Sequence, residues 1–548
     1  MSEPSPHGLI AHWPFSTDCH ERVGVGLTVR NHGVRIGGGG SGPRPGTGAA
    51  VFDGQTAVLE VTDHPVLAWG TRAFTVAAWL HTSALENDVV GDVLCKFDRA
   101  TRTGLHLGIL TNGGVTSTSQ ANYRNLHFGI DSGRPAPRWD DCGRPGNAVL
   151  IAALKVASDQ LYAGTLETGA DERGRLWRYA GDRQWVDLGN PVACNVVHSV
   201  AEFDGALYCG VGRFMGEGSA LGALPNRTRG GQVFRVDMDG RWTYCGHPGA
   251  VDATPEDVPT VGYASGKADD VFALTVYRGQ LYCASNHRRG AFVYEGGESW
   301  RYVGPDLRIL SFTVYRGRLY ALINGGPVYS YEGEGEWTDC GCPAGSTQTY
   351  GAVTTEGRLH VGTWPEGEVH RYEGRQEWTS LGRVGYEREI MGMVLYNGKP
   401  YVGSLPMANV WRMDAGEFAF MGSLDTAAAP LRRVWAMAVY KGKLFAGTLP
   451  SGHVRSLEAG RMATWDRAFP PGWHHVAAVR DETRLRLYVD GVPVAASSPF
   501  DASDYDLSNG RPLTIGFGVN EHFEGLMSDL RLYGRALGAP EVAGLAAR

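Results

Sequence analysis

The stretch VYRGQLYCAS, residues 276–285, decides the fold, because close variants of it recur through the middle of the chain. The repeat unit has an apolar segment, a turn that is mostly of the type Tyr/Phe-x-Gly-x, a Leu-Tyr or similar pair and a run of small residues. Sequence repeats with a period of roughly 20–50 residues are typical of solenoids and propellers. The seven copies are VASDQLYAGT (156–165), EFDGALYCGV (202–211), VYRGQLYCAS (276–285), VYRGRLYALI (314–323), TTEGRLHVGT (354–363), LYNGKPYVGS (395–404) and VYKGKLFAGT (439–448).

Most copies continue into a third strand and then into a fourth strand that begins near a tryptophan. Four short strands per unit, with alternating side chains and turn residues between them, form the pattern of a propeller blade. Seven units therefore predict a seven-bladed β-propeller. The fourth strands of the first six copies contain Trp185, Trp242, Trp300, Trp337, Trp378 and Phe418.

The seventh copy is not followed by such a fourth strand. A separate copy of it, PRWDDCGRPG with Trp139, stands before the first repeat instead. A propeller closes when a strand from one end of the array completes the last sheet, which leaves no open sheet edge. We therefore expect the segment around Trp139 to complete the sheet that begins near Phe445.

The two flanks of the repeat array contain strand motifs of another kind. These motifs are His12-Trp13-Pro14, Phe52-Asp53-Gly54, Phe74 to Trp79, Trp473 to Val476, Leu487 to Gly491 and Ser528 to Tyr533. They resemble the front and back of one laminin-G-like, concanavalin A-like (lectin/glucanase) jelly roll, and the repeat region resembles seven-bladed propellers of the kelch and sialidase type. The resemblance implies an all-β protein whose seven-bladed β-propeller (134–460) is inserted into a jelly-roll sandwich formed by residues 1–133 and 461–548. Such insertion is tolerated where two chain ends lie close together on a surface.

Composition excludes several classes of protein. The chain has 548 residues, a formal net charge of −7 and a sequence pI near 6.2, which argues against a general nucleic-acid binder with a basic face. The sequence has no apolar stretch near the roughly 20 residues of a membrane span, and its start lacks the regions of a signal peptide. The nine cysteines are odd in number, and several recur at one repeat position, which favours packed thiols over disulfides. We therefore expect a cytoplasmic protein.

The loops that follow the second strand or precede the first strand of each blade surround the channel mouth. This mouth is the default pocket of the fold. Arginine side chains bind carboxylates and phosphates, and tryptophan or tyrosine faces stack against sugar rings. We therefore expect a small saccharide or another anionic small molecule to bind there. The ligand-binding candidates are Arg213, Asn226, Asn286, Arg288, Arg289, Arg308, Trp364, Glu366, Arg388, Arg433 and Trp435.

Two long insertions, 212–230 and 248–270, come from adjacent repeats. Loops of this length are often functional, and we interpret them as a lid or wall on one side of the channel. The alternative for the arginines is a structural one, in which they are solvated or form surface ion pairs. Their partners would then be Glu387, Glu389, Asp269 and Asp270.

The same mouth also contains candidates for catalysis. A lyase acting on a uronic sugar needs a cation beside the carboxylate and a Tyr or His that takes the neighbouring proton. The catalytic candidates are His198, His287, Tyr263 and Tyr350. Three hypotheses stay open: a carbohydrate-recognising protein, which we favour, a polysaccharide lyase or glycoside hydrolase, and a protein-interaction platform.

The jelly-roll resemblance further implies a structural calcium ion. Asp53 and Asp529 stand at the matching motif positions. Calcium prefers six or so hard oxygen ligands, so further ligands would be needed. The sequence has no Cys-x-x-Cys pair and no His-Glu-x-x-His motif, and it predicts no other cofactor.

Overall fold

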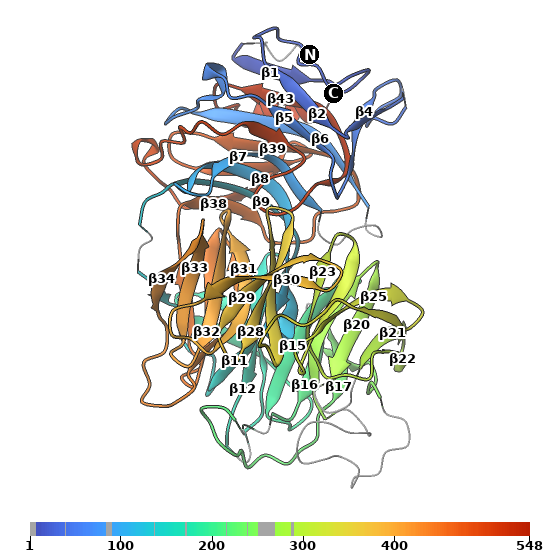
Figure 1. The fold of residues 1–548 in the computed structure, drawn as a ribbon, viewed down its shortest axis with the longest axis vertical. Helices are drawn as coiled ribbons and strands as arrows, with labels where there is room; N and C mark the ends of the chain where they lie inside the picture. The colour runs from blue at the N-terminus through green and yellow to red at the C-terminus, as the bar shows by residue number, and fades with distance from the viewer. Residues whose placement is uncertain are drawn as a thin grey trace.

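The computed structural model shows a sandwich of two β-sheets at one end of the molecule and a ring of smaller sheets at the other (Figure 1). It describes residues 7–38, 40–83, 90–135, 138–169, 172–214, 216, 218–237, 239–249, 269–285 and 290–547. Within these ranges the one α-helix is α1 (Ala539–Ala546), which contacts the sandwich. A search of the same ranges finds no helix that is long and apolar enough to cross a membrane.

Both sheets of the sandwich combine strands from the two ends of the chain. Strand β39 pairs with β6 from Gly472↔Thr82 to Arg480↔Phe74, and β38 pairs with β9. Side chains alternate along a strand, so Phe74 and Leu80 of β6 point into the apolar core. The first sheet contains β3 (Arg35–Gly37), β4 (Ala49–Asp53), β43 (Glu524–Tyr533), β6 (Phe74–Thr82), β39 (Gly472–Arg480), β40 (Leu485–Val489) and β41 (Val492–Ala496) in this order, with β1 (Leu9–Trp13) beside β43. The second contains β2 (Val29–His32), β5 (Val58–Val61), β42 (Leu513–Ile515), β7 (Gly91–Asp98), β8 (Thr103–Val115), β9 (Ser119–Ser132) and β38 (Arg461–Trp465).

The ring is built from the repeats, and its inner strands contact one another in a closed circle. The inner strands are β11 (Leu150–Ala157), β15 (Val196–Phe203), β19 (Val271–Tyr277), β23 (Ile309–Tyr315), β27 (Gln348–Thr355), β31 (Glu389–Tyr396) and β35 (Arg433–Tyr440). The next strands outward are β12 (Gln160–Leu166), β16 (Ala206–Gly212), β20 (Gln280–Ser285), β24 (Arg318–Ile323), β28 (Arg358–Trp364), β32 (Lys399–Leu405) and β36 (Lys443–Leu449). The third strands are β13 (Leu176–Gly181), β17 (Gln232–Val236), β21 (Ala291–Gly296), β25 (Val328–Gly333), β29 (Glu368–Gly374), β33 (Asn409–Asp414) and β37 (Val454–Leu457). The outermost strands are β14 (Gln184–Gly189), β18 (Trp242–Tyr244), β22 (Ser299–Gly304), β26 (Glu336–Asp339), β30 (Glu377–Arg383), β34 (Glu417–Ser423) and β10 (Asp140–Asp141).

The prediction of seven separate blades is wrong, because the described residues form five four-stranded blades. The strands of the first two repeats, β11 to β18, lie in one eight-stranded sheet instead. Their union rests on a single pair between β12 and β15, Leu166↔Val196. Nothing in the described part of the chain assigns the ring to the kelch or sialidase type.

The last repeat receives its outermost strand from the start of the array. Strand β10 follows Trp139 and pairs with β37 through Asp140↔Ser456. The repeated tryptophans explain how neighbouring repeats are joined, since each indole Nε1 donates to a backbone carbonyl of the repeat before it around the ring. These bonds are Trp139 to Met421 (2.9 Å), Trp185 to Cys142 (2.9 Å), Trp242 to Leu188 (2.7 Å), Trp300 to Cys245 (2.7 Å), Trp337 to Val303 (2.7 Å) and Trp378 to Cys340 (2.9 Å).

The long hairpin of β8 and β9 belongs to the sandwich at its base and enters the ring at its tip (Figure 1). Its turn is the 3-10 segment η2 (Thr116–Thr118), whose side chains are fully buried. The tip contacts inner strands on several sides of the ring, including β11, β19 and β35. The hairpin thus fills the channel from the side of the sandwich.

Amide side chains fix the hairpin inside the channel. The Gln120 amide donates to the Val276 carbonyl (2.8 Å) and accepts from the Val276 N–H (2.7 Å). Asn122 makes the same two bonds to Val439, at 2.7 Å and 2.9 Å, and Asn112 makes them to Leu395, at 3.3 Å and 2.8 Å. Each amide therefore satisfies backbone groups of an inner strand that would otherwise be buried without partners.

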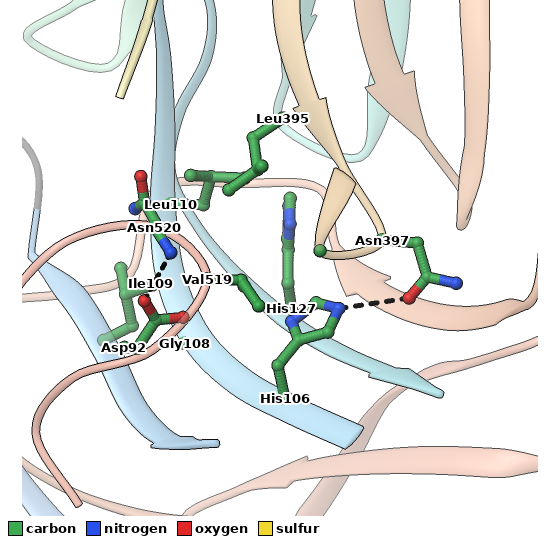
Figure 2. A pocket seen from close by; sticks show the side chains of 11 residues that line it. Asp92, His106, Gly108, Ile109, Leu110, His127, Leu395, Asn397, Val519 and Asn520 are labelled. Atoms are coloured by element: carbon green, nitrogen blue, oxygen red, sulfur yellow. Dashed lines mark hydrogen bonds between the residues drawn. The ribbon is translucent and has the colours of Figure 1, made fainter. Parts of the chain in front are cut away.

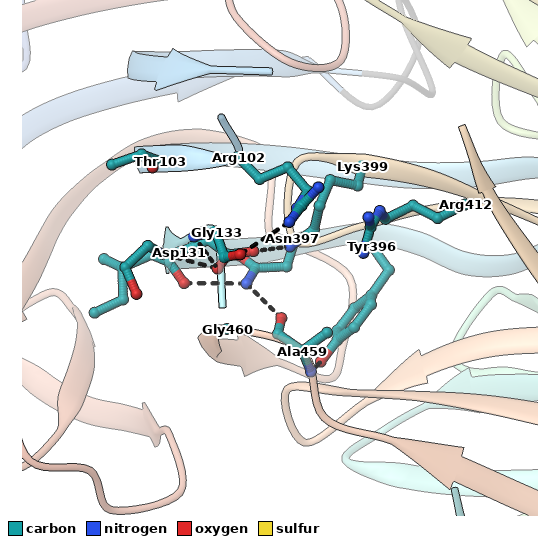
Figure 3. A network of polar contacts seen from close by, with 12 residues as sticks. Arg102, Thr103, Asp131, Gly133, Tyr396, Asn397, Lys399, Arg412, Ala459 and Gly460 are labelled. Atoms are coloured by element: carbon teal, nitrogen blue, oxygen red, sulfur yellow. Dashed lines mark hydrogen bonds and ion pairs between the residues drawn. The ribbon is translucent and has the colours of Figure 1, made fainter. Parts of the chain in front are cut away.

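Polar side chains also join the base of the hairpin to the ring. Figure 2 shows His106 of β8, whose Nε2 lies 3.0 Å from Asn397 Oδ1, beside a cavity of ≈ 10 Å³. Burial lowers the pKa of His106 to about 4 and raises the pKa of the neighbouring Asp92 to about 7. Figure 3 shows that Asn397 donates to the carbonyls of Ile130 and Ala459, next to the buried pair of Lys399 and Asp131. The cavity beside His106 holds about one water molecule. The contacts between the hairpin base and Asn397 are therefore structural.

Candidate functional site

A cavity of ≈ 260 Å³ lies at the end of the channel that faces away from the sandwich. The last residues of β28 and β32, and residues that start β27, β31 and β35, surround it. Its lining residues are Phe214, Gly218, Ser219, Phe272, Arg308, Gln348, Tyr350, Trp364, Glu389, Leu405, Leu431, Arg433 and Trp435. Aromatic rings and charged groups therefore face the same small space.

The repeat places these side chains in two tiers. Aligning the copies on their Gly turns puts one residue at the head of each inner strand and another two positions later. In five successive repeats the head position is polar, and we call this set the first tier: Asp270, Arg308, Gln348, Glu389 and Arg433. At the second position, four of the seven residues are aromatic or histidine, and we call these four the second tier: His198, Phe272, Tyr350 and Trp435. Because one strand position recurs around the ring, side chains far apart in sequence converge at the mouth.

The tip of the sandwich hairpin supports the floor of this cavity. Trp435 Nε1 donates to Ser117 Oγ (2.7 Å), and Thr116 Oγ1 donates to the Trp435 carbonyl (3.0 Å). Trp435 is 1% exposed, and its ring lies edge-on to Tyr350 with a centroid distance of 6.3 Å. The cavity is therefore a closed-ended pocket and not one end of an open pore.

The first long insertion forms one wall of the cavity. Arg433 donates to the carbonyl of Gly218 (3.0 Å), which links the last repeat to a loop of the second. The Phe214 backbone N–H donates to Asn195 Oδ1 (2.8 Å), while Asn195 Nδ2 donates back to the Phe214 carbonyl (2.8 Å). These contacts hold residues of the first insertion against the mouth. Most of the second insertion, 251–268, lies outside the described residues.

Glu389 is the buried acid of the cavity. It is 4% exposed, and its Oε1 has no hydrogen-bond partner in the described structure. Burial raises the pKa of Glu389 to about 7, although the charge of Arg433 acts in the opposite direction. At neutral pH this carboxyl group is thus present in both protonation states.

His198 belongs to the second tier by its repeat position, but it does not line the cavity. Its ring is fully buried 4.4 Å from the ring of Phe272, and its Nδ1 lies 2.7 Å from Asp270 Oδ2. This pair joins two neighbouring repeats, since His198 belongs to β15 and Asp270 directly precedes β19. A structural role for His198 follows from this placement.

The rim of the cavity carries a cation over an aromatic ring. The Arg388 guanidinium lies 4.7 Å from the ring centre of Trp364. Tyr386, two residues earlier, is 93% exposed. The rim therefore offers flat surfaces to solvent beside the charged interior.

The structure brings together only part of the predicted ligand set. Arg308, Tyr350, Trp364, Arg433 and Trp435 line the cavity. Arg213 instead pairs with Asp269, Asn226 donates to the carbonyls of Glu172 and Ala193, Glu366 is exposed outside the lining, and Arg388 covers Trp364. Tyr263, Asn286, His287, Arg288 and Arg289 lie outside the described residues.

Sequence reasoning missed Glu389, Gln348, Phe214 and Phe272 as cavity residues. Glu389 was interpreted only as a surface partner for arginine, whereas it is the buried carboxyl group of the site. The available signal was the register of the inner strands, because Arg308, Gln348, Glu389 and Arg433 share one repeat position.

The two carboxylates predicted to bind calcium have other partners. Asp53 accepts hydrogen bonds from the backbone N–H groups of Gln55, Thr56 and Ala57. Asp529 Oδ1 lies 2.7 Å from His12 Nε2 and 2.9 Å from Arg531 Nε. Among the described residues, no group of three or more His, Cys, Asp or Glu side chains could hold a metal ion. As placed, Asp53 and Asp529 do not fit a shared calcium ion.

Comparison with known proteins relates one part of the chain to a family. Residues 453–543 match the concanavalin A-like lectin/glucanases superfamily, and this segment runs from β37 through most of the C-terminal strands into α1. The comparison with curated proteins finds no match.

Several solved structures are similar to the chain at low sequence identity. Virginiamycin B lyase from Staphylococcus aureus, in a catalytically inactive form with quinupristin, has 10% identity and a TM-score of 0.42, covering 59% of this chain and 99% of that one. The WD40 β-propeller domain of Doa1 has 11% identity and a TM-score of 0.37, covering 58% and 96%. The computationally designed Ika8 protein has 12% identity and a TM-score of 0.37, covering 69% and 99%. At these TM-scores the similarities carry no argument about function.

Proposed function

We propose that the channel mouth binds a small polar or acidic saccharide. The observation that carries this proposal is the placement of Arg308 and Arg433 in one closed-ended cavity with Trp364, Tyr350 and Trp435. Guanidinium groups bind carboxylates with directed hydrogen bonds, and aromatic faces suit the apolar faces of a sugar ring. A ligand that combines an anionic group with a pyranose ring uses both features.

The size of the cavity favours a small ligand. Pockets for drug-sized molecules measure roughly 300–1,000 Å³, and this cavity has ≈ 260 Å³. A single sugar with its acidic substituent is therefore a better match than a longer chain, whose further units would lie on the rim near Arg388 and Tyr386.

The sandwich supports this proposal in two ways. Its match to the concanavalin A-like lectin/glucanases superfamily hints at carbohydrate binding. Its hairpin also supports Trp435 from below. We infer that the propeller is inserted into the sandwich and that the two parts form one carbohydrate-recognising unit.

Calorimetric titration with glucuronate and with glucose tests the proposal. Replacing Arg308 with alanine should weaken glucuronate binding about tenfold or more and remove the preference over glucose, because a charge-assisted bond is lost. Trp364→Ala should weaken both sugars. Arg318→Ala is the matched control, since this exposed arginine of the same repeat pairs with Glu332 outside the mouth. Equal affinities in all four proteins would contradict the proposal.

Glu389 supports an enzyme as the second candidate function. A general acid or base works best when its pKa lies near the working pH, and Glu389 has a raised pKa of about 7 inside the cavity. A lyase or glycoside hydrolase would use this group to transfer a proton at the bound sugar. In a screen of acidic oligosaccharides, Glu389→Gln should abolish release of reducing ends while glucuronate still binds. Turnover that survives this change would exclude Glu389 as the catalytic acid or base.

A further inference from the structure

A second cavity, of ≈ 480 Å³, lies where the last repeat meets the first. We call it the seam groove, and its lining includes Arg178 and Tyr179 of the first repeat and Lys441, Lys443 and Phe445 of the last. It is separate from the mouth, because Lys441 belongs to the turn between β35 and β36, at the sandwich side of the ring. The Lys441 backbone N–H donates to Asp466, which follows the sandwich strand β38 (2.9 Å).

The seam groove differs from the other repeats by one missing acid. In β13 the arginine Arg178 lies opposite Tyr162 of the neighbouring strand, and the residue two positions later is Ala180. In each of the other six repeats the equivalent of Ala180 is acidic. These six residues are Asp237, Glu295, Glu332, Glu373, Asp414 and Glu458.

These acids neutralise the arginines that correspond to Arg178. Arg235 pairs with Asp237 at 3.1 Å, Arg371 with Glu373 at 2.7 Å, and Arg412 with Asp414 at 2.6 Å. In the described structure, Arg178 forms neither an ion pair nor a hydrogen bond. Because Ala180 is exposed, nothing in the packing requires a small residue there.

Neither lysine of the seam groove forms an ion pair in the described structure, although the charge of Lys441 acts on the nearby Asp466 carboxylate. Glu458, which lies opposite Lys443 between β36 and β37, contacts Arg461 instead, at 3.9 Å. The Lys441 ammonium lies 5.1 Å from the ring centre of Tyr440. Asp182 is the carboxylate in the lining of the groove, so three cations face one anion.

We propose that the seam groove binds a small ligand that carries a divalent oxyanion. Among the lining residues, three cations against one carboxylate leave two positive charges, which two negative charges on a phosphate monoester or a dicarboxylate would neutralise. The guanidinium of Arg178 offers directed donors, and the two ammonium groups add charge without strict geometry. The rings of Tyr179 and Phe445, whose centroids lie 5.8 Å apart, form an apolar wall for the rest of the ligand.

Titration calorimetry at low ionic strength tests this proposal, with inorganic phosphate and succinate as the two probes. The protein should bind at least one of them at a single site, and the tighter probe identifies the phosphate or dicarboxylate class. Ala180→Glu restores the acid of the other repeats and should weaken binding about tenfold or more, as should Arg178→Ala. Arg371→Ala, at the equivalent position of a repeat that retains its acid, should bind within about twofold of the unaltered protein.

Each titration is repeated in the Arg308→Ala background, because the mouth also contains arginines. Binding that survives Arg308→Ala and is lost on adding Ala180→Glu belongs to the seam groove, whatever happens at the mouth. Binding that Ala180→Glu leaves unchanged would overturn the proposal, and so would the absence of saturable binding for both probes.

Discussion

The two ends of the propeller channel use the same inner strands in opposite ways. At the sandwich end, Gln120, Asn122 and Asn112 of the hairpin bind backbone groups of Val276, Val439 and Leu395. These three partners occupy one repeat position, directly before the Tyr-x-Gly turn. The hairpin therefore recognises the repeat itself, and polar groups of the channel find partners within the protein.

At the mouth end, two of the polar side chains at the heads of the same strands, Glu389 and Arg433, each keep one buried atom without a hydrogen bond in the described structure. In the described structure, these atoms are Oε1 of Glu389 and Nε of Arg433. Leaving buried polar groups unpaired costs free energy, so a fold that leaves them around a cavity is suited to a ligand that pairs with them. This difference supports the proposal that one end of the channel serves stability and the other binds a ligand.

The largest effect is expected at Gly114, where the hairpin packs tightly against an inner strand of the ring. A Cβ added at Gly114 would lie 2.6 Å from the Ala352 Cβ, and Gly114 has a φ of +73°. Gly114→Ala should lower the free energy of unfolding by about 4 kcal/mol, through left-handed strain and overpacking together. Denaturant unfolding of the variant and of the unaltered protein measures this loss of unfolding free energy.

A matched control separates these two causes. Gly416 has a φ of +93° and no atom within 4 Å of an added Cβ. Gly416→Ala should therefore cost only about 1–2 kcal/mol, from backbone strain alone. Equal losses in the two variants would show that the hairpin does not pack tightly in the channel.

The second effect concerns the mouth and depends on pH. In the folded protein the pKa of Glu389 rises from 4.5 to about 7, so the folded state holds this proton more tightly than the unfolded state. The associated stability is present below pH 4.5 and is lost as the pH rises through 7. Glu389→Gln stays neutral and should therefore gain stability over the unaltered protein between pH 5 and pH 8, by up to about 3 kcal/mol.

The measurement is the difference in unfolding free energy between variant and unaltered protein at the two pH values. Asp92 and Asp466, whose pKa values burial also raises to about 7, are present in both proteins and cancel in this difference. A gain that does not vary with pH would mean that Glu389 has an ordinary pKa and that the mouth end is not under electrostatic strain.

The number and spacing of the sequence repeats predicted much of the ring, because the tryptophan recurs for a physical reason. Each indole N–H bonds to a neighbouring repeat, so the isolated Trp139 could be assigned to the other end of the array, where β10 pairs with β37. The number of separate sheets was not predictable. It depends on one pair, Leu166↔Val196, whose residues carry no special sequence signal.

The candidate site was harder to predict than the ring. Residues such as Arg308 and Trp364 were found because their side-chain chemistry is distinctive. Glu389 was not found, since burial decides whether a carboxyl group is a surface partner or a cavity acid, and burial depends on the whole ring. The hairpin was hidden for a similar reason: its sequences GLHLGIL and NLHFGID alternate like ordinary sandwich strands, and only Asn112, Gln120 and Asn122 distinguish its inner part.

The smallest effect is expected at Ser117, where the two ends of the channel meet. Ser117→Ala removes the acceptor of the Trp435 indole N–H and should cost about 1–2 kcal/mol of stability, because a buried donor is left unpaired. It should also weaken glucuronate binding by a few-fold, since Trp435 lines the cavity. Thr118→Val is the control: the Thr118 hydroxyl is buried without a partner in the described structure, so its removal should be neutral or stabilising and leave binding unchanged. If Ser117→Ala lowers stability but leaves the affinity for glucuronate as it was, the hairpin supports the channel without shaping the mouth, and the two ends are independent.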